Sequence, residues 1–272
     1  MCKHLLVFLL ISKHSKTKIN VKMKKIINMV LQKLNYRIVS AYGYTLIDKH
    51  EISKKNLVNL MPLVLNLLSN DMNEIRFVQV GANNGVTNDN FRDYLEKYNF
   101  TGIMIEPQER AYKKLNALYA EHPNIICENI AISITREPIE FYYFDKQYEK
   151  GMQLDVFSST YEKHLTRWKR KMRLEANIVK EVISTTTVDD LLKKYDFRTI
   201  EILIIDTEGY DYEIIKSINF DSLHPYLIQY EHINLSAKDQ LDAIGLLISK
   251  DYEVLSYEKD TIAVHKSIFN LI

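Results

Sequence analysis

Cysteine, glycine and proline are scarce in this chain, and no charge of either sign predominates. Its 272 residues include only two cysteines, Cys2 and Cys127, with neither in a Cys-x-x-Cys pair. A disulfide framework is therefore excluded and a zinc site is not expected, which favours a reducing compartment and predicts a cytoplasmic protein. Seven glycines and five prolines provide no linker rich in these residues, so the sequence marks no clear domain boundary.

The charge balance and the N-terminal segment limit the expected partners. Thirty-six basic and thirty-five acidic residues leave a net charge of +1, so we expect neither nucleic acid binding nor attraction to an anionic membrane. The apolar run at 5–11 is shorter than the roughly 20 residues of a membrane-spanning helix. Residues 1–22 are either a packed or frayed segment or a targeting signal, and Met23 is an alternative start. We expect no stable membrane insertion, and the oligomeric state stays open.

Apolar periodicity predicts alternating strands and helices over most of the chain. An amphipathic helix is expected at 52–69, with a kink or restart near Pro62. The strands expected after it are 75–80, 102–105, 124–127, 139–144, 201–205, 226–230, 253–257 and 261–265, and the helices are 90–98, 109–121, 212–217 and 238–249. This order predicts an α/β fold with a doubly wound, mostly parallel sheet and a terminal antiparallel hairpin.

We predict two regions and one insertion. Residues 1–70 form an N-terminal helical extension, and residues 71–272 form the main domain. Within this domain, 145–181 is interpreted as a helical insertion that caps the substrate side of the site. Its basic stretch from Arg167 to Arg173, with Ser158 and Ser159, is a candidate contact for a phosphate or carboxylate on the substrate, although such a run is more often a solvated helix face.

Two features at strand ends indicate a nucleotide-type ligand. The loop Gly81-Ala82-Asn83-Asn84-Gly85 follows the first strand of the main domain, and glycine there allows positive φ and close approach of a ligand. Its G-x-x-x-G spacing alone fits a structural turn equally well. Glu106 ends the next strand about twenty residues later, where a carboxylate can accept hydrogen bonds from both ribose hydroxyls of an adenosine. Together they favour an adenosine cofactor.

Three motifs in order resemble the FkbM-type methyltransferases. They read FVQVGANNG at 77–85, GIMIEP at 102–107 and IDTEGYD at 205–211. The resemblance covers roughly 75–235 and implies a class I methyltransferase fold, Rossmann-like with seven strands. It also implies methyl transfer from S-adenosylmethionine, usually to a hydroxyl on a sugar or polyketide-like product. Cofactor contacts are implied for Gly81, Ala82, Asn83, Gly85, Glu106, Asn129, Ala131 and Asp206.

The chain departs from the usual pattern at two positions. Gln79 stands where many class I methyltransferases have an acid that holds the amino end of the cofactor, and its amide oxygen can still accept a hydrogen bond. Ile204 stands where many family members have a lysine, so a role for that lysine is not expected here. Neither change removes the predicted cofactor site.

The predicted catalytic residues lie at the ends of two later strands. Asp206 and Glu208 belong to the Asp-Thr-Glu-Gly motif, and their carboxylates could orient the acceptor or bind the ammonium of the cofactor. They could also hold a divalent cation, which nothing else in the sequence supports, so we predict no metal ligands. His232, after the following strand, is a candidate general base for the attacking hydroxyl, with a structural histidine as the alternative.

The leading prediction is an S-adenosylmethionine-dependent O-methyltransferase acting on a sugar, glycan or related small molecule. A nicotinamide-dependent oxidoreductase of related fold is an alternative, although the full dinucleotide fingerprint is missing. A second alternative is a non-catalytic module that binds S-adenosylmethionine. A nucleic-acid methyltransferase is disfavoured, because the fourth strand ends in Asp-Thr-Glu-Gly instead of an Asn-Pro-Pro-Tyr type of motif.

Overall fold

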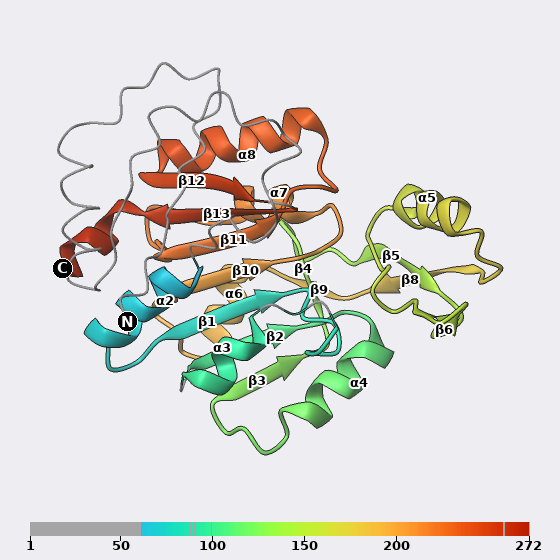
Figure 1. Cartoon of the computed structure of the whole chain (residues 1–272), viewed down its shortest axis with the longest axis horizontal. Helices are drawn as coiled ribbons and strands as arrows, with labels where there is room; N and C mark the ends of the chain where they lie inside the picture. The colour runs from blue at the N-terminus through green and yellow to red at the C-terminus, as the bar shows by residue number, and fades with distance from the viewer. Residues whose placement is uncertain (1–60, 88, 90, 99, 258, 272) are drawn as a thin grey trace, which may run out of the picture.

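The centre of the molecule is a seven-stranded, mostly parallel sheet (Figure 1). A computed structural model describes residues 61–271 except 88, 90, 99 and 258. The strand order is β12-β13-β11-β10-β1-β2-β3. The parallel strands are β1 (Arg76–Val80), β2 (Thr101–Ile105), β3 (Ile125–Glu128), β10 (Ile202–Ile205) and β11 (Leu227–Glu231). The buried Val, Ile and Leu residues of β1, β2, β10 and β11 are typical of parallel strands covered on both faces, whereas the edge strand β3 is half-buried.

An antiparallel hairpin completes the sheet. It consists of β12 (Tyr252–Tyr257) and β13 (Asp260–His265), and β13 pairs with β11 in the antiparallel direction. The predicted class I methyltransferase architecture, with its terminal hairpin, is therefore confirmed.

Helices cover both faces of the sheet and bury two apolar layers. On one face, Val78, Ile103 and Leu203 pack with residues of α6 (Val188–Lys194), α7 (Asp211–Ser217) and α8 (Ala237–Ser249). On the other, Phe77 and Met104 pack with α2 (Met61–Asp71), with Phe91 just before α3 (Arg92–Lys97), and with α4 (Glu109–Leu118). A short 3-10 helix, η3 (Lys266–Leu271), adds Ile268 to this second layer.

The strand register brings the carboxyl ends of neighbouring strands to one edge. Val80 pairs with Ile105 and with Ile205, and Ile205 pairs with Tyr230. The next residues in each chain segment, which include Glu106 and Asp206, therefore lie side by side. This edge is where ligands bind in open α/β sheets.

A small unit of mixed structure projects beyond this edge (Figure 1). Its antiparallel pair β5 (Ile139–Phe144) and β8 (Ile178–Ile183) carries α5 (Glu162–Met172) and a hairpin of β6 (Tyr148–Glu149) and β7 (Met152–Gln153). A short parallel pair, β4 (Ala131–Ile132) with β9 (Thr185–Thr186), joins the unit to the main body. The 145–181 region is thus partly helical and partly β.

The observed elements follow the predicted ones closely, with local differences. The helix expected at 109–121 ends at Leu118, and that expected at 90–98 spans Arg92–Lys97. Helix α6 was not predicted; Thr187 caps it by accepting a hydrogen bond from the Asp190 amide at 3.1 Å. The predicted N-terminal extension falls mostly outside the described residues, and of it only 61–70, within α2, can be compared. In the part of the chain that the structure describes, no helix has the length and apolar character to cross a membrane.

Candidate functional site

A cavity opens at the carboxyl edge of the sheet, between the glycine loop and the projecting unit. Residues from β1, β2, β10, the loops after them and the insertion line it. Seven of the predicted cofactor-binding residues are among them: Gln79, Gly81, Ala82, Asn83, Glu106, Ala131 and Asp206. The strand register explains their convergence, because each lies near or just after the carboxyl end of a strand that terminates at this edge.

Gly81 lets the loop after β1 approach β10 closely. Its φ is +81°, and a Cβ atom there would lie 1.8 Å from the backbone oxygen of Asp206. No other residue fits this position without moving the backbone. The turn then continues through Asn83, which has a φ of +48°. The sequence-based argument for glycine at this point agrees with the geometry.

Glu106 is buried beneath this loop and holds it in place. Its carboxylate accepts backbone N–H bonds from Asn83 and Gln108, both at 2.8 Å. Burial raises the pKa of Glu106 to about 7, against the effect of these two N–H donors. Each carboxylate oxygen keeps a further lone pair for a ligand hydroxyl. The residue therefore both shapes the loop and faces the cavity.

Two of the predicted cofactor residues lie away from the cavity wall. Gly85 is buried against Leu115 of α4, where its missing side chain leaves room for packing. The Asn129 amide donates to the backbone oxygens of Glu106 and Pro107 at 2.9 and 3.0 Å. Neither residue is part of the lining described for the cavity, so their predicted contacts with a cofactor stay predictions and their visible roles are structural.

Gln79 provides a direct indication that the cavity accommodates a polar ligand. Its side chain is 5% exposed and lines the cavity, yet its amide oxygen Oε1 has no hydrogen-bond partner within the protein. An unsatisfied buried acceptor costs about 1–3 kcal/mol unless a ligand or water satisfies it. The residues present therefore fit a ligand with a donor group, such as an ammonium, at this position.

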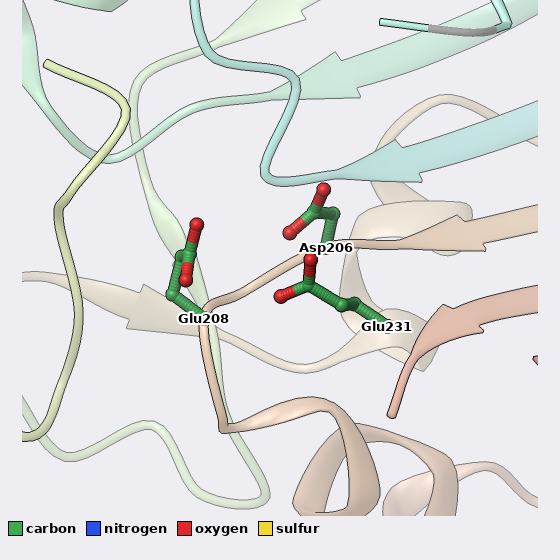
Figure 2. Close-up of side chains that lie close together, drawn as sticks. All are labelled: Asp206, Glu208 and Glu231. Carbon is green, nitrogen blue, oxygen red and sulfur yellow. The ribbon is translucent and has the colours of Figure 1, made fainter. Parts of the chain in front are cut away.

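Three carboxyl groups meet at the ends of β10 and β11 (Figure 2). Asp206, Glu208 and Glu231 each have an oxygen within 4.8 Å of the oxygens of the other two. The Lys259 ammonium lies 3.1 Å from Glu231 and 3.8 Å from Asp206. Sequence reasoning identified Asp206 and Glu208. It did not identify Glu231, although this residue ends β11 and the same strand-end signal could have found it. It also did not identify Lys259, because only the pairing of β11 with β13 brings the hairpin to this place.

The crowding of these acids changes their protonation. Burial, together with the negative charge of Glu231, raises the pKa of Glu208 to about 8. Burial and the neighbouring Glu231 and Glu208 also raise the pKa of Asp206 well above its usual range. Three oxygen ligands of this kind could bind a divalent cation. Lys259 already places a positive charge between two of them, so the geometry does not require a metal.

His232 has a less prominent position than its sequence context suggested. Its Nδ1 lies 3.0 Å from the hydroxyl of Thr261 on β13, and burial lowers its pKa. His232 is not among the described residues that line the cavity. Its role as general base therefore stays a prediction without geometric support.

The insertion contributes contacts that sequence reasoning missed. Asp155, with no exposed surface, pairs with Arg110 and Lys114 of α4 at 2.9 and 3.1 Å. Its backbone oxygen accepts a hydrogen bond from the side chain of Asn83 in the glycine loop at 3.1 Å. Farther along, His164 of α5 reaches Glu208, with 2.9 Å between Nε2 and Oε2. The insertion thus contacts both ends of the cavity.

The other predicted residues of the insertion divide between the cavity and the surface. Ser158 lines the cavity, whereas Ser159 is buried and its hydroxyl donates to the backbone oxygen of Glu208 at 3.0 Å. In the basic stretch, Arg167, Arg170, Lys171 and Arg173 are exposed. Their predicted contact with a substrate anion stays a prediction.

The fold and the cavity at its carboxyl edge define a domain of the class I methyltransferase type. The model of the methyltransferase FkbM domain matches residues 79–257, which are 179 of the 272 residues. The chain therefore belongs to the FkbM methyltransferase family, as the three motifs predicted.

Comparison with solved structures gives distant similarities. An FkbM methyltransferase from Methylobacillus flagellatus is 14% identical with a TM-score of 0.44; the match covers 71% of this chain and 44% of that one. An rRNA methylase from Streptococcus thermophilus is 10% identical with a TM-score of 0.41, covering 76% and 97%. A precorrin-6y C5,15-methyltransferase from Geobacter metallireducens is 11% identical with a TM-score of 0.39, covering 81% and 97%. The comparison with curated proteins gives no significant match.

Proposed function

We propose that this protein transfers a methyl group from S-adenosylmethionine to a hydroxyl of a sugar, a glycan or a related small molecule. The observation that carries the proposal is the cavity that joins Glu106 at one end to Asp206 and Glu208 at the other, across Gly81. When bound, S-adenosylmethionine supplies an electrophilic methyl group on a positively charged sulfur. Buried carboxyl groups at one end of the cavity suit this positive charge, and Glu106 at the other end is placed to accept hydrogen bonds from ribose hydroxyls.

Each end of the cavity would hold a different part of the cofactor. The second lone pairs of the Glu106 carboxylate would accept hydrogen bonds from the ribose hydroxyls, and Ala131 would lie beside the adenine. The unpaired Oε1 of Gln79 would accept a hydrogen bond from the ammonium of the methionine portion. Asp206 would lie next to the same portion.

The charge of the acid cluster favours a cationic ligand. With all three carboxyls ionised, Lys259 leaves the cluster at −2, and one bound proton brings it to −1. A sulfonium would neutralise this remaining charge. The acceptor hydroxyl must lose its proton as it attacks, and Glu208 and Asp206, which line the cavity, are the candidate proton acceptors.

Calorimetric titration with S-adenosylmethionine, S-adenosylhomocysteine and NAD tests the cofactor. We expect the first two to bind and NAD to give no signal. Tight binding of NAD without a response to the other two would refute the proposal and support the oxidoreductase alternative. Incubation with methyl-labelled S-adenosylmethionine and a panel of nucleotide sugars and glycans tests transfer. Cofactor binding without transfer to any hydroxyl-bearing acceptor would favour the non-catalytic alternative.

The variant Glu106→Gln tests the ribose contact. Losing charge-assisted hydrogen bonds of about 1.5–3 kcal/mol should weaken binding of S-adenosylmethionine roughly 10- to 100-fold. Glu109→Gln, three residues away on the exposed surface of α4 and paired with Lys113, is the matched control and should bind normally. Equal affinities for the two variants would exclude the ribose role of Glu106.

A further inference from the structure

Two buried oxygen atoms of cavity-lining residues have no hydrogen-bond partner. They are Oε1 of Gln79, on β1, and Oδ2 of Asp89, in the segment between the glycine loop and α3. Both residues line the cavity, and among the residues that the structure describes no group donates to either atom. A buried acceptor without a donor is costly unless a ligand or a water molecule satisfies it. Both atoms therefore indicate that a donor binds in this part of the cavity.

The carboxylate of Asp89 is fixed by the start of α3. Its other oxygen, Oδ1, accepts hydrogen bonds from the backbone N–H groups of Phe91 at 2.9 Å and Arg92 at 3.3 Å. The ring of Phe91 packs edge-on against Phe77 of β1, with 5.2 Å between the ring centroids, and this contact ties the segment to the sheet. Oδ2 is thus the oxygen that remains for a ligand.

Asp89 supplies a negative charge beside Gln79. In the sheet Gln79 pairs with Ile204 of β10, so neither of these two neighbouring side chains is charged. Burial raises the pKa of Asp89, and the Phe91 N–H and the side-chain amide of Gln79 oppose this increase. The amide and the carboxylate are therefore neighbours. A positively charged donor between them would satisfy both free oxygens and stabilise the ionised acid.

The acid cluster differs from this pair because it already contains a cation. The Lys259 ammonium lies 3.1 Å from Glu231 and 3.8 Å from Asp206. Near Asp89 the charge of Arg92 is present, but it lowers the pKa of the carboxyl less than the Phe91 N–H and the Gln79 amide do. Oδ2 of Asp89 therefore retains its capacity to bind a cation.

We propose that Asp89 and Gln79 together bind the ammonium of the methionine portion of S-adenosylmethionine, with Asp89 as the charged partner. This inference rests on the proposed function, because it names a further residue of the same cofactor site. An ammonium has three N–H donors, so one can bind Oδ2 of Asp89 and another Oε1 of Gln79. The negative charge that is missing at Gln79 would thus come from the segment after the glycine loop. The two positive groups of the cofactor would have separate partners, with the sulfonium at the acid cluster and the ammonium at Asp89.

Calorimetry of the full chain with S-adenosylhomocysteine and its deamino analogue, in which hydrogen replaces the α-amino group, tests the inference. The sulfur of both compounds is neutral, so the ammonium is the only cation that distinguishes them. The wild type should bind the deamino analogue at least about 10-fold more weakly, because both oxygens then stay without a donor. Equal affinities of the wild type for the two compounds would overturn the inference.

Asp89→Asn removes the charge and retains an oxygen for the N–H groups of Phe91 and Arg92. Its affinity for S-adenosylhomocysteine should fall about 10-fold, since hydrogen bonds to a charged partner are roughly twice as strong as neutral ones. Its affinity for the deamino analogue should change less than about 2-fold, because this compound has no ammonium. Equal losses of affinity for the two compounds would show that Asp89 only supports α3, and would overturn the inference.

Asp93→Asn is the matched control. Asp93 is exposed in the first turn of α3, so the substitution removes a carboxylate from the same end of the same helix. We expect this variant to bind both compounds as the wild type does. A loss of affinity for S-adenosylhomocysteine equal to that of Asp89→Asn would show a general effect of charge at α3 and contradict direct contact.

Returning the charge at Gln79 separates a binding role from a structural one. The double variant Gln79→Glu with Asp89→Asn has one carboxylate at the pair, and its affinity for S-adenosylhomocysteine should return to within about 3-fold of the wild type. An affinity as low as that of Asp89→Asn would overturn the inference, because support of α3 cannot be restored from β1. If Asp89→Asn does not fold, Gln79→Met removes the second acceptor, and it should narrow the difference between the two compounds; an unchanged difference would overturn the inference.

The two levels of the proposal fail in different ways. If S-adenosylhomocysteine does not bind to the wild type, the proposed function fails and the inference fails with it. If S-adenosylhomocysteine binds and the amino group or Asp89 makes no difference to its affinity, only the assignment of Asp89 fails.

Discussion

Replacing Asp155 by asparagine would test how firmly the insertion is attached to the main domain. The carboxylate is fully buried and pairs with Arg110 at 2.9 Å and Lys114 at 3.1 Å. Breaking a buried ion pair commonly costs 3–5 kcal/mol, because the partner charge is left buried. Here about a third of each cation's side chain is exposed, so water can solvate the unpaired charges. We therefore expect a smaller loss of about 2 kcal/mol in the free energy of unfolding.

A matched variant separates burial from ion pairing. Asp190 pairs with Arg136 at 2.7 Å, but 74% of the arginine side chain is exposed. Asp190→Asn removes the same charge in the same way and should cost less than about 1 kcal/mol. Thermal unfolding at one pH and salt concentration would measure both. The expected decrease in Tm for Asp155→Asn is about 4–8 °C, with a much smaller decrease for the control.

The same variant should also affect the cofactor site. The segment at Asp155 accepts a hydrogen bond from Asn83, so a loosened insertion removes a support of the glycine loop. We expect weaker binding of S-adenosylmethionine by calorimetry in Asp155→Asn and normal binding in Asp190→Asn. Equal stability and equal affinity in the two variants would refute the reasoning. The burial of Asp155 would then add nothing to stability, and its contact with the glycine loop would add nothing to cofactor binding.

Three further predictions concern the backbone at Gly81, the pH dependence of stability and the general base of the reaction. Gly81→Ala should abolish binding of S-adenosylmethionine in calorimetry, since its Cβ would overlap the backbone of Asp206, whereas Gly151→Ala, also at positive φ but in open space, should bind normally. Equal binding by the two variants would contradict the close approach of Gly81 to Asp206. Because burial raises the pKa of Glu106 to about 7 and of Glu208 to about 8, the native state binds more protons than the unfolded chain above pH 4.5. The free energy of unfolding contributed by these groups should therefore fall as the pH rises from about 4.5 to about 8, between the unfolded and the native pKa values, and a Tm that rises over this range would be inconsistent. His232→Gln should lower methyl transfer if this residue is the base, and unchanged turnover with an identified acceptor would exclude that role.

Local sequence was sufficient to predict the alternation of strands and helices. Short apolar runs such as Ile202–Ile205 indicate buried strands of a covered sheet, and amphipathic spacing identified α4 and α8. Helix α6 was not predicted because it has only seven residues, too few to show a clear helical periodicity of apolar residues. The insertion was interpreted as helical because of its charged run, and the pairing of β5 with β8 across the intervening segment was not recognised.

The positions of Gly81, Glu106 and Asp206 were also determined by sequence. Each directly follows a predicted parallel strand, and parallel strands in register end at one edge, so their meeting required no knowledge of side-chain packing. His232 follows a strand in the same way, but its ring lies against Thr261 because β13 pairs beside it. The end of a strand determines where the backbone of the residue lies, and the neighbouring strand determines where its side chain points.

Only the tertiary structure decided which groups complete the site. Lys259, Asp155 and His164 belong to a hairpin turn and an insertion, and no periodicity relates them to the strand ends that they contact. Their partners lie far along the chain; Asn83 and Asp155, for example, are separated by 72 positions in the sequence. Sequence by itself determined the sheet, its ligand-binding edge and the family, because these follow from local patterns. The charge and protonation of the acid cluster depend on long-range packing, which brings His164 and Lys259 to Glu208 and its neighbours.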